Sequence, residues 1–300
     1  AILFFDGFGD FTSTMIATGK GNKIEVIDKV IYPHSAGIFY TSLTQYLGFS
    51  HYGDEYKVMG LAPYGEPKYV EELKKVIRFT PNGLFELDTK FFTHAKDGVC
   101  ISFEGGDPHI ESIFSDELIK LLGPARKQGE DLTQKHKDIA TSVQKVTEEL
   151  IFQILNHLQR RTGLKNICIA GGVAQNSVAN GKILERTSFE KVYIPSAGHD
   201  AGTAMGSGLW LYNHIQGNDR LPAVYNAYTG YKASNEEIEA CLRENEVEYS
   251  RYEEKELLEV VSQALVDGAV VGWFQGRAEF GPRALGHRSI LVDPTRTDAK

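Results

Sequence analysis

The chain has 300 residues, of which 42% are hydrophobic and 24% are charged, a composition typical of globular proteins that excludes disordered and fibrous chains. Lys and Arg total 32 against 40 Asp and Glu, so the formal charge is -8 and argues against tight, non-specific binding of nucleic acid. The longest apolar runs, such as residues 1–5, fall far short of the roughly 20 residues of a membrane-spanning helix. We therefore expect neither nucleic acid nor a membrane as a partner.

The cysteines and the chain ends suggest where the protein works and how complete it is. Cys100, Cys168 and Cys241 stand far apart in the sequence and form no zinc or iron–sulfur spacing. Isolated thiols are typical of a reducing compartment, which predicts a cytoplasmic protein. The chain opens directly in an apolar run and stops in a turn, so we expect it to be an internal piece of a longer protein.

Three strands are predicted at the start of the chain. The apolar run at residues 1–5 is typical of a buried central strand. Residues 11–18 and 24–31 are expected to form two more strands, joined by a hairpin turn at residues 19–22. Between the first and second strands, the Gly and Asp residues at positions 6–10 predict a turn.

Helical patterns follow at residues 37–47 and 55–61. Residues 81–107 show no clear period, so we expect a lid or an insertion there. The strongest helix is predicted over residues 132–158, where apolar residues recur at steps of three, four and seven and so form one stripe.

A strand–helix–strand–helix unit is predicted next, and it indicates an α/β protein. Its strands are expected at residues 166–170 and 191–194, and its helices at 173–185 and 200–214. A linker with Gly217, Pro222 and Gly230 then leads to a smaller, acidic segment. That segment is expected to hold two helices and a strand, at residues 235–245, 253–266 and 269–274.

The first candidate site is Asp6-Gly7-Phe8-Gly9, at the end of the first strand. A carboxylate at this position could bind a metal ion, and Gly7 and Gly9 would let backbone N–H groups approach a phosphate without interference from a Cβ atom. An ordinary hairpin turn with Asp and Gly in their usual positions is the alternative.

Two further candidates follow later strands. The Gly171-Gly172 pair before a helix start favours an anion, although no Walker A loop or GxGxxG motif is present and a plain turn is the alternative. Asp200 follows the next strand, where it could cap the following helix or face Asp6 as a second metal-binding carboxylate.

The last candidates are cationic. Arg277, Arg283 and Arg288 fall within twelve residues of an acidic chain, and guanidinium groups bind phosphate or carboxylate with two hydrogen bonds. A solvated charged loop is the alternative. His34 and Lys57 lie next to predicted helix starts and could contact a substrate, although single His and Lys residues are more often structural or solvated.

Six stretches together resemble the O-carbamoyltransferases of the nodulation and antibiotic-tailoring type, the NodU/CmcH family. They are DGFG at residues 6–9, YPHSAG at 32–37, EYKVMGLAPYG at 55–65, AGGVAQN at 170–176, DAG at 200–202 and FQGRAEFGPRALG at 274–286. The resemblance covers most of the chain, and its third and sixth stretches are the most specific.

The resemblance implies an α/β fold in two modules. Residues 1–230 would form an actin-like ATPase module, of the duplicated ribonuclease H-like kind, that lacks its N-terminal part and is similar to the tRNA threonylcarbamoyl transferase. Residues 231–300 would form a connecting segment and the start of a second α/β module, which makes carbamoyl-adenylate from ATP and carbamoyl phosphate.

The resemblance also implies site residues. In the family, a divalent metal, of the iron type or Mg or Mn, is held by two aspartates, which match Asp6 and Asp200, and by an upstream HxxxH motif that lies before the first residue of this chain. The implied nucleotide-binding residues are Gly7, Gly9, Gly171, Gly172, Asn176, Arg277 and Arg288, and the implied catalytic residues are His34, Lys57 and Arg283.

The implied function is an ATP-dependent O-carbamoyltransferase. It would move a carbamoyl group from carbamoyl phosphate, through carbamoyl-adenylate, to a hydroxyl of a small molecule or sugar, by positioning and charge neutralisation. Its partners would be this acceptor and the rest of its own chain, a homodimer is left open, and the piece alone is expected to be inactive. An actin-like sugar kinase or ATPase and a non-catalytic nucleotide-binding lobe are the alternatives.

Overall fold

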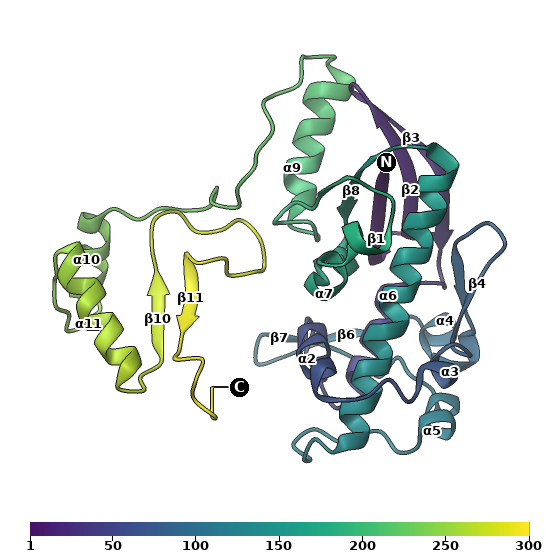
Figure 1. The fold of residues 1–300 in the computed structure, drawn as a ribbon, viewed down its shortest axis with the longest axis horizontal. Coiled ribbons are helices and arrows are strands. Elements are labelled where there is room, and N and C mark those ends of the chain that lie inside the picture. Colours follow the sequence, from purple (N-terminus) through teal and green to yellow (C-terminus); the bar gives the residue numbers. More distant parts are fainter. Residues whose placement is uncertain (300) are drawn as a thin grey trace. The chain divides into compact units, whose positions relative to one another are not determined.

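The computed structural model describes residues 1–299 and divides into two compact units, Ala1–Arg220 and a second unit that begins at Leu221 (Figure 1). Each unit is described by itself. Within the described residues, none of the helices combines the length and the apolar character needed to cross a bilayer.

A five-stranded sheet forms the centre of the first unit. Its strands are β1 (Ile2–Gly9), β2 (Thr12–Lys20), β3 (Lys23–Ile31), β8 (Asn166–Ala170) and β9 (Lys191–Tyr193), in the order β3-β2-β1-β8-β9. The first three strands pair antiparallel, whereas β8 runs parallel to both β1 and β9. The predicted central strand is thus confirmed, and the mixed α/β class with it. The actin-like architecture stays a prediction.

The turn predicted at residues 6–10 is wrong in its position. Strand β1 continues to Gly9, its register with β2 shifts between Phe5 and Gly9, and the chain reverses only at Asp10 and Phe11. Asp10 takes the left-handed backbone conformation, with φ of 52°, which Asp tolerates better than most residues. The glycines of this stretch therefore lie in the irregular end of a strand.

Two helices cover the sheet, α1 (Ala36–Tyr46) and α6 (Gln134–Thr162). Helix α1 begins where the Ser35 hydroxyl accepts the N–H of Ile38, and α6 ends at Gly163, which has a φ of 66°. Both helices match their predictions to within a few residues. Their sequences form helices because each carries an apolar stripe toward the sheet.

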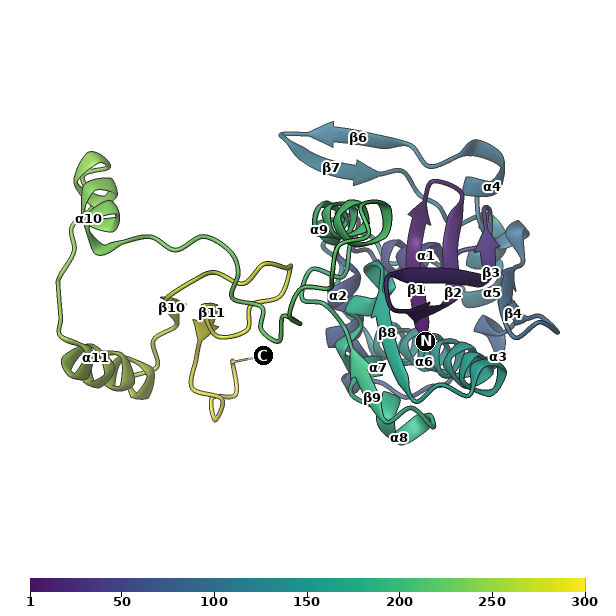
Figure 2. The ribbon, with the colours of Figure 1, turned by 90° about the horizontal axis from the view of Figure 1, so that it is seen from above.

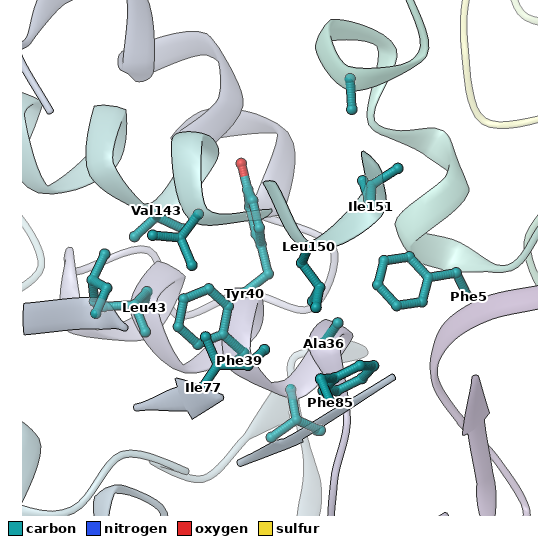
Figure 3. Packing of buried hydrophobic residues seen from close by; sticks show 14 of the residues in the cluster. Phe5, Ala36, Phe39, Tyr40, Leu43, Ile77, Phe85, Val143, Leu150 and Ile151 are labelled. Carbon is teal, nitrogen blue, oxygen red and sulfur yellow. The ribbon is translucent and has the colours of Figure 1, made fainter. Parts of the chain in front are cut away.

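The core of the first unit lies between these helices and the sheet. Figure 3 shows Phe39 and Leu43 of α1 in one cluster with Val143 and Leu150 of α6, and with Phe5 of β1. Each of these side chains is almost completely buried. Burial of one such side chain contributes about 1.5–3 kcal/mol, so this cluster fixes the end of β1 relative to α1.

The segment between α1 and α6 is more regular than its sequence predicts. It begins with helix α2 (Glu55–Leu61), whose bounds are as predicted. Two short antiparallel hairpins and several short helices follow, and Figure 2 shows the second hairpin projecting from the body of the first unit. The elements are η1 (Ala62–Tyr64), α3 (Val70–Leu73), β4 (Ile77–Phe79), β5 (Phe85–Leu87), η2 (Thr89–Phe91), α4 (His94–Asp97), β6 (Ile101–Glu104), β7 (Asp107–Ile110) and α5 (Asp116–Leu122).

The single helix predicted over residues 173–185 is wrong. The structure has three short pieces there, η3 (Gly172–Gln175), α7 (Ser177–Asn180) and α8 (Ile183–Arg186). Asn176 interrupts the first two because its backbone is extended, with ψ of 90°, while its side chain caps α7. The helix predicted over 200–214 is α9 (Gly202–Leu209), followed by a π-helical turn at Trp210–Ile215.

The second unit contains two helices and a two-stranded antiparallel sheet. Helices α10 (Asn235–Glu244) and α11 (Glu254–Val266) agree with prediction. Strand β10 (Val271–Phe274) pairs with β11 (Arg288–Leu291), a strand that the sequence did not indicate because charged and glycine-rich residues precede it. The stretch between these strands carries the three predicted arginines.

Candidate functional site

Asp6 lies where strand β1 meets the glycine bend that follows β8. Its Oδ1 atom accepts the N–H of Gly7 at 2.8 Å and the N–H of Gly172 at 2.9 Å. Strands β1 and β8 are parallel neighbours, so their carboxyl ends share one edge of the sheet, the edge at which α/β proteins bind ligands. The structure therefore brings together the Asp6 stretch and the Gly171-Gly172 stretch.

Glycine is required at the bend because the backbones approach closely. A Cβ atom on Gly171 would lie 2.2 Å from the Phe5 carbonyl oxygen, and one on Gly172 would lie 2.7 Å from Asp6 Oδ1. Gly171 also has a φ of 107°, a conformation that L-residues rarely adopt. The doubled glycine thus serves to pack the bend against β1.

The amide cradle predicted at Gly171 and Gly172 is not formed. The Gly171 N–H donates to the carbonyl of Gly198 at 2.6 Å, and the Gly172 N–H is used by Asp6. An amide already bonded inside the protein cannot also bind a phosphate without breaking that bond. Nucleotide binding at Gly171 and Gly172 stays a prediction.

The start of helix α1 packs against the Gly7 stretch of β1. The Ser35 hydroxyl donates to the Gly7 carbonyl at 2.6 Å, and a Cβ on Gly37 would lie 2.6 Å from the Gly7 Cα. The DGFG and YPHSAG stretches are therefore in direct contact. A Cβ on Gly7 itself would meet no atom within 4 Å, and one on Gly9 would lie 3.5 Å from the ring of Phe4, so open space lies beside Gly7.

Asp200 does not cap helix α9, so that alternative is wrong. The N-cap residue is Ala201, and no side chain caps the helix. Burial and then the negative charges of Asp200, Glu55 and Asp6 raise the pKa of Tyr52, because ionisation of its phenol would add a like charge. Asp200 also lies close to the glycine bend along the chain, because the carbonyl of Gly198 accepts the Gly171 N–H at 2.6 Å. The sequence did not indicate Tyr52.

The chemistry of these two carboxylates suits a divalent cation. Within the described residues, no hydrogen bond reaches Asp6 Oδ2 or either carboxylate oxygen of Asp200. Free carboxylate oxygens are the ligands that hard divalent cations prefer. In residues 1–299 no group of three or more His, Cys, Asp and Glu side chains gathers for a metal, and metal binding by Asp6 and Asp200 stays a prediction.

Asn176 is tied into a buried polar network. Its side-chain amide and that of Gln144 on α6 exchange two hydrogen bonds of 2.9 and 3.0 Å, and its Oδ1 also accepts the N–H of Ala179. Gln144 in turn contacts Glu148, whose carboxylate binds Lys182 at 2.8 Å. Asn176 therefore fixes the start of α7, and its contact with a nucleotide stays a prediction.

His34 and Lys57 are both held by neighbours. Leu87 donates its N–H to His34 Nδ1 at 3.1 Å, so the neutral imidazole carries its proton on Nε2. His34 lines a surface hollow of about 460 Å³ between the end of β3 and the β4–β5 hairpin. Lys57 Nζ forms an ion pair with Asp54 Oδ1 at 2.6 Å. The predicted catalytic roles of His34 and Lys57 stay predictions.

In the second unit, one buried carboxylate organises the Arg-rich stretch. Glu279 accepts the N–H groups of Leu285 and His287 at 2.6 and 2.9 Å, and the Nε–H of Arg288 at 2.9 Å. Burial alone would raise the pKa of Glu279, but these donors outweigh it and hold the pKa at about 2. Arg288 thus has an internal partner, which the sequence did not indicate.

The other two arginines lie in or beside the same loop. Arg277 is exposed and donates to the Thr229 carbonyl at 3.3 Å. Arg283 is half-buried, and its carbonyl accepts a hydrogen bond from Arg288 at 3.2 Å. Phosphate binding by Arg277 and Arg288, and the catalytic role of Arg283, stay predictions.

Comparison with known proteins identifies related chains. The family model described as carbamoyltransferase N-terminus matches residues 1–209, and the one described as carbamoyltransferase C-terminus matches residues 262–300. The uncharacterized protein sll1178 of Synechocystis sp. is 40% identical over 305 residues, which cover 99% of this chain and 48% of that protein.

Two nodulation proteins are similar over the same extent. Nodulation protein NolO of Bradyrhizobium diazoefficiens is 35% identical over 100% of this chain and 50% of its own length. Nodulation protein NolNO of Sinorhizobium fredii is 34% identical over 98% of this chain and 40% of its own length. The chain thus spans about half the length of the curated relatives it matches.

The first family model alone covers more than half of the chain and includes both aspartates and the glycine bend. The predicted resemblance is therefore confirmed, and the chain belongs to the carbamoyltransferase family.

Proposed function

We propose that the whole protein is an ATP-dependent O-carbamoyltransferase. It converts ATP, carbamoyl phosphate and water to carbamoyl-adenylate, pyrophosphate and phosphate, and then moves the carbamoyl group to a hydroxyl of a small molecule or sugar, which releases AMP. Membership of the carbamoyltransferase family supports the choice of carbamoyl as the transferred group. The similarity to nodulation proteins is compatible with a small-molecule acceptor.

One observation carries the proposal within this chain, the convergence of Asp6, Asp200 and the glycine bend. Asp6 is held by the Gly172 N–H at 2.9 Å, and the carbonyl of Gly198, two residues before Asp200, accepts the Gly171 N–H at 2.6 Å. The bend and the open space beside Gly7 give a polyphosphate close access to the backbone at the sheet edge. Such a site suits a nucleotide whose phosphate charge is neutralised nearby.

The residues of this chain would then bind and orient the reactants. Carbamoyl-adenylate is a mixed anhydride with a good leaving group, so positioning and charge neutralisation suffice and no covalent nucleophile is needed. In the second unit, Arg277 and Arg283 would neutralise phosphate, whereas Arg288 would hold the loop through Glu279. Asp6 and Asp200 would hold a divalent cation, which supplies positive charge near the phosphate and the carbonyl group.

The test uses the whole protein purified with a divalent cation, ATP, carbamoyl phosphate and labelled pyrophosphate. We expect label to enter ATP only when carbamoyl phosphate is present, and without any acceptor, because adenylate formation is reversible. No carbamoyl-phosphate-dependent exchange would overturn the proposal. Transfer of phosphate from ATP to a sugar would instead support the kinase alternative.

A further inference from the structure

Strand β1 leaves the regular pairing of the sheet at residues 6–8. On one side, its register with β8 ends at Phe4, and on the other side, its register with β2 is interrupted between Phe5 and Gly9. The interrupted stretch includes Asp6, the first of the two predicted metal ligands. Irregularities of this kind redirect side chains near functional sites, but they also leave the backbone without its usual partners. The orientation of Asp6 therefore depends on contacts from outside the sheet.

Ser35, the N-cap residue of helix α1, provides such a contact. Its hydroxyl donates to the Gly7 carbonyl at 2.6 Å and lies 3.2 Å from the Asp6 carbonyl oxygen. The same hydroxyl oxygen accepts the N–H of Ile38 at 3.1 Å. Ser35 is 0% exposed, so water cannot replace these bonds if the hydroxyl is removed. One buried side chain thus joins the start of α1 to the backbone of Asp6 and Gly7.

The helix that carries Ser35 is itself firmly placed. Figure 3 shows Phe39 of α1 in one buried cluster with Phe5 of β1. At the start of the helix, a Cβ on Gly37 would lie 2.6 Å from the Gly7 Cα atom, so the two backbones are in close contact. A hydroxyl on an element that packing holds in place keeps its hydrogen-bond partner in one orientation.

The Asp6 carboxylate depends on this backbone because only one of its oxygens is bound. Its Oδ1 atom accepts the N–H groups of Gly7 and Gly172, whereas Oδ2 has no hydrogen bond within the part of the chain that the structure describes. The direction of Oδ2 follows from the orientation of the Asp6 and Gly7 peptide groups. Gly7 has wide conformational freedom, so without the Ser35 hydroxyl these peptide groups could rotate.

We propose that Ser35 is a positioning residue that holds the Asp6 carboxylate in the orientation needed to bind a divalent cation. The inference rests on the metal site of the proposed function. Ser35 acts through Asp6 and contacts neither the cation nor the reactants. Removal of a residue that orients a metal ligand commonly weakens metal binding by 10- to 100-fold, and we expect a loss of about tenfold here.

The decisive experiment compares S35A with S13A in the whole protein. Ser13 on β2 is a matched control, because it is also 0% exposed and its hydroxyl donates at 2.6 Å to the His34 carbonyl and lies 3.4 Å from the Val30 carbonyl oxygen. Both substitutions remove a buried hydroxyl, but only Ser35 contacts Asp6 and Gly7. Measured by electron paramagnetic resonance, Mn²⁺ should bind about tenfold more weakly to S35A and within about twofold of the original affinity to S13A.

Two further variants separate orientation of Asp6 from the start of the helix. S35A also removes the N-cap of α1, and this loss lowers stability whatever else Ser35 does. Glycine is a good N-cap residue but has no hydroxyl, so S35G should begin the helix and still bind Mn²⁺ about tenfold more weakly. S35T retains a hydroxyl that can donate and accept, and it should restore the affinity to within a few-fold of the original.

A double variant tests whether Ser35 acts through Asp6. If it does, D6N combined with S35G should bind Mn²⁺ as weakly as D6N alone, because the ligand that Ser35 orients has already lost its charge. A general loosening of the first unit would instead weaken binding further in the double variant. The affinity of the double variant is therefore a measurement that a purely structural role would change in the opposite sense.

The outcomes decide as follows. If S35A and S35G bind Mn²⁺ as tightly as the original protein, if S13A loses as much affinity as S35A, or if the double variant binds much more weakly than D6N, the inference about Ser35 is overturned. It is also overturned if D6N binds Mn²⁺ as tightly as the original protein. Pyrophosphate exchange, measured in parallel, tests the proposed function separately, because exchange that is absent from the original protein refutes that function whatever the Mn²⁺ affinities are.

Discussion

The Asp6 region of the first unit and the Arg-rich stretch of the second use a carboxylate in opposite ways. Asp6 accepts two backbone N–H bonds through one oxygen and keeps the other oxygen free. Glu279 has both oxygens bonded, to the backbone of its own loop and to Arg288. The comparison shows that a carboxylate in a glycine-rich loop is available to a ligand only where the loop leaves it incompletely bonded.

The largest effect should come from the glycine bend. Replacing Gly171 with Ala forces a Cβ to within 2.2 Å of the Phe5 carbonyl oxygen at a φ of 107°, so we expect a loss of about 3–5 kcal/mol in the free energy of unfolding. Urea unfolding of the whole protein measures this loss. Replacing Gly7 with Ala is the matched control, because open space surrounds it, and it should change stability by less than about 1 kcal/mol. Equal losses in both variants would contradict the close approach of β1 and the bend.

The second effect concerns Glu279 and its partner. Replacing Arg288 with Ala leaves a buried carboxylate without its cation, so the second unit should melt several degrees lower. Replacing Arg277 with Ala removes an exposed guanidinium and should leave the melting temperature nearly unchanged. Calorimetry of the whole protein compares the two variants. If the Arg277 variant melts as low as the Arg288 variant, the ion pair of Arg288 with Glu279 is not the source of the stability.

The same carboxylate predicts an acid dependence of stability. Its pKa lies at about 2 in the folded protein, below its ordinary value of 4.5. A lowered pKa stabilises the fold above the ordinary value, and this contribution is lost as the pH falls from about 4.5 toward 2. We expect E279Q, followed by melting temperature against pH, to lose that part of the acid dependence. An unchanged slope in E279Q would assign the effect to other carboxylates.

The smallest effect on stability should come from Asp6, although its effect on activity should be severe. The substitution D6N preserves an oxygen that can accept the Gly172 N–H, so stability should change by about 1 kcal/mol or less. Loss of the charge should reduce binding of Mn²⁺ to the whole protein, measured by electron paramagnetic resonance. Mn²⁺ binding that persists unchanged in D6N would remove Asp6 from the metal site.

The sequence predicted most long elements of this fold, because their signals are local. The apolar stripe of α6 and the bounds of α2 follow from spacing within one element. The break at Asn176 was missed because it depends on Gln144 from a distant helix, which holds the side chain that ends one helical piece and caps the next. Tertiary contacts of this kind override local propensity.

The candidate site was predictable in part for the same reason. Asp6, Asp200 and the glycine pair stood out by residue type and by position after strands, and the resemblance to a family added their roles. Tyr52 and Glu279 carry no such pattern. Their importance depends on which charges and N–H groups surround them, and only the folded chain provides that information.

The parallel pairing of β1 with β8 has a consequence for how the protein is made. Asp6 and Gly172 lie 166 positions apart, yet one hydrogen bond joins them. During synthesis the first three strands emerge early, but their open edge has no partner until β8 has left the ribosome. Pairing of the β1 edge with β8 must therefore wait until most of the first unit has been translated, and a contact so distant in the sequence is expected to form late in folding.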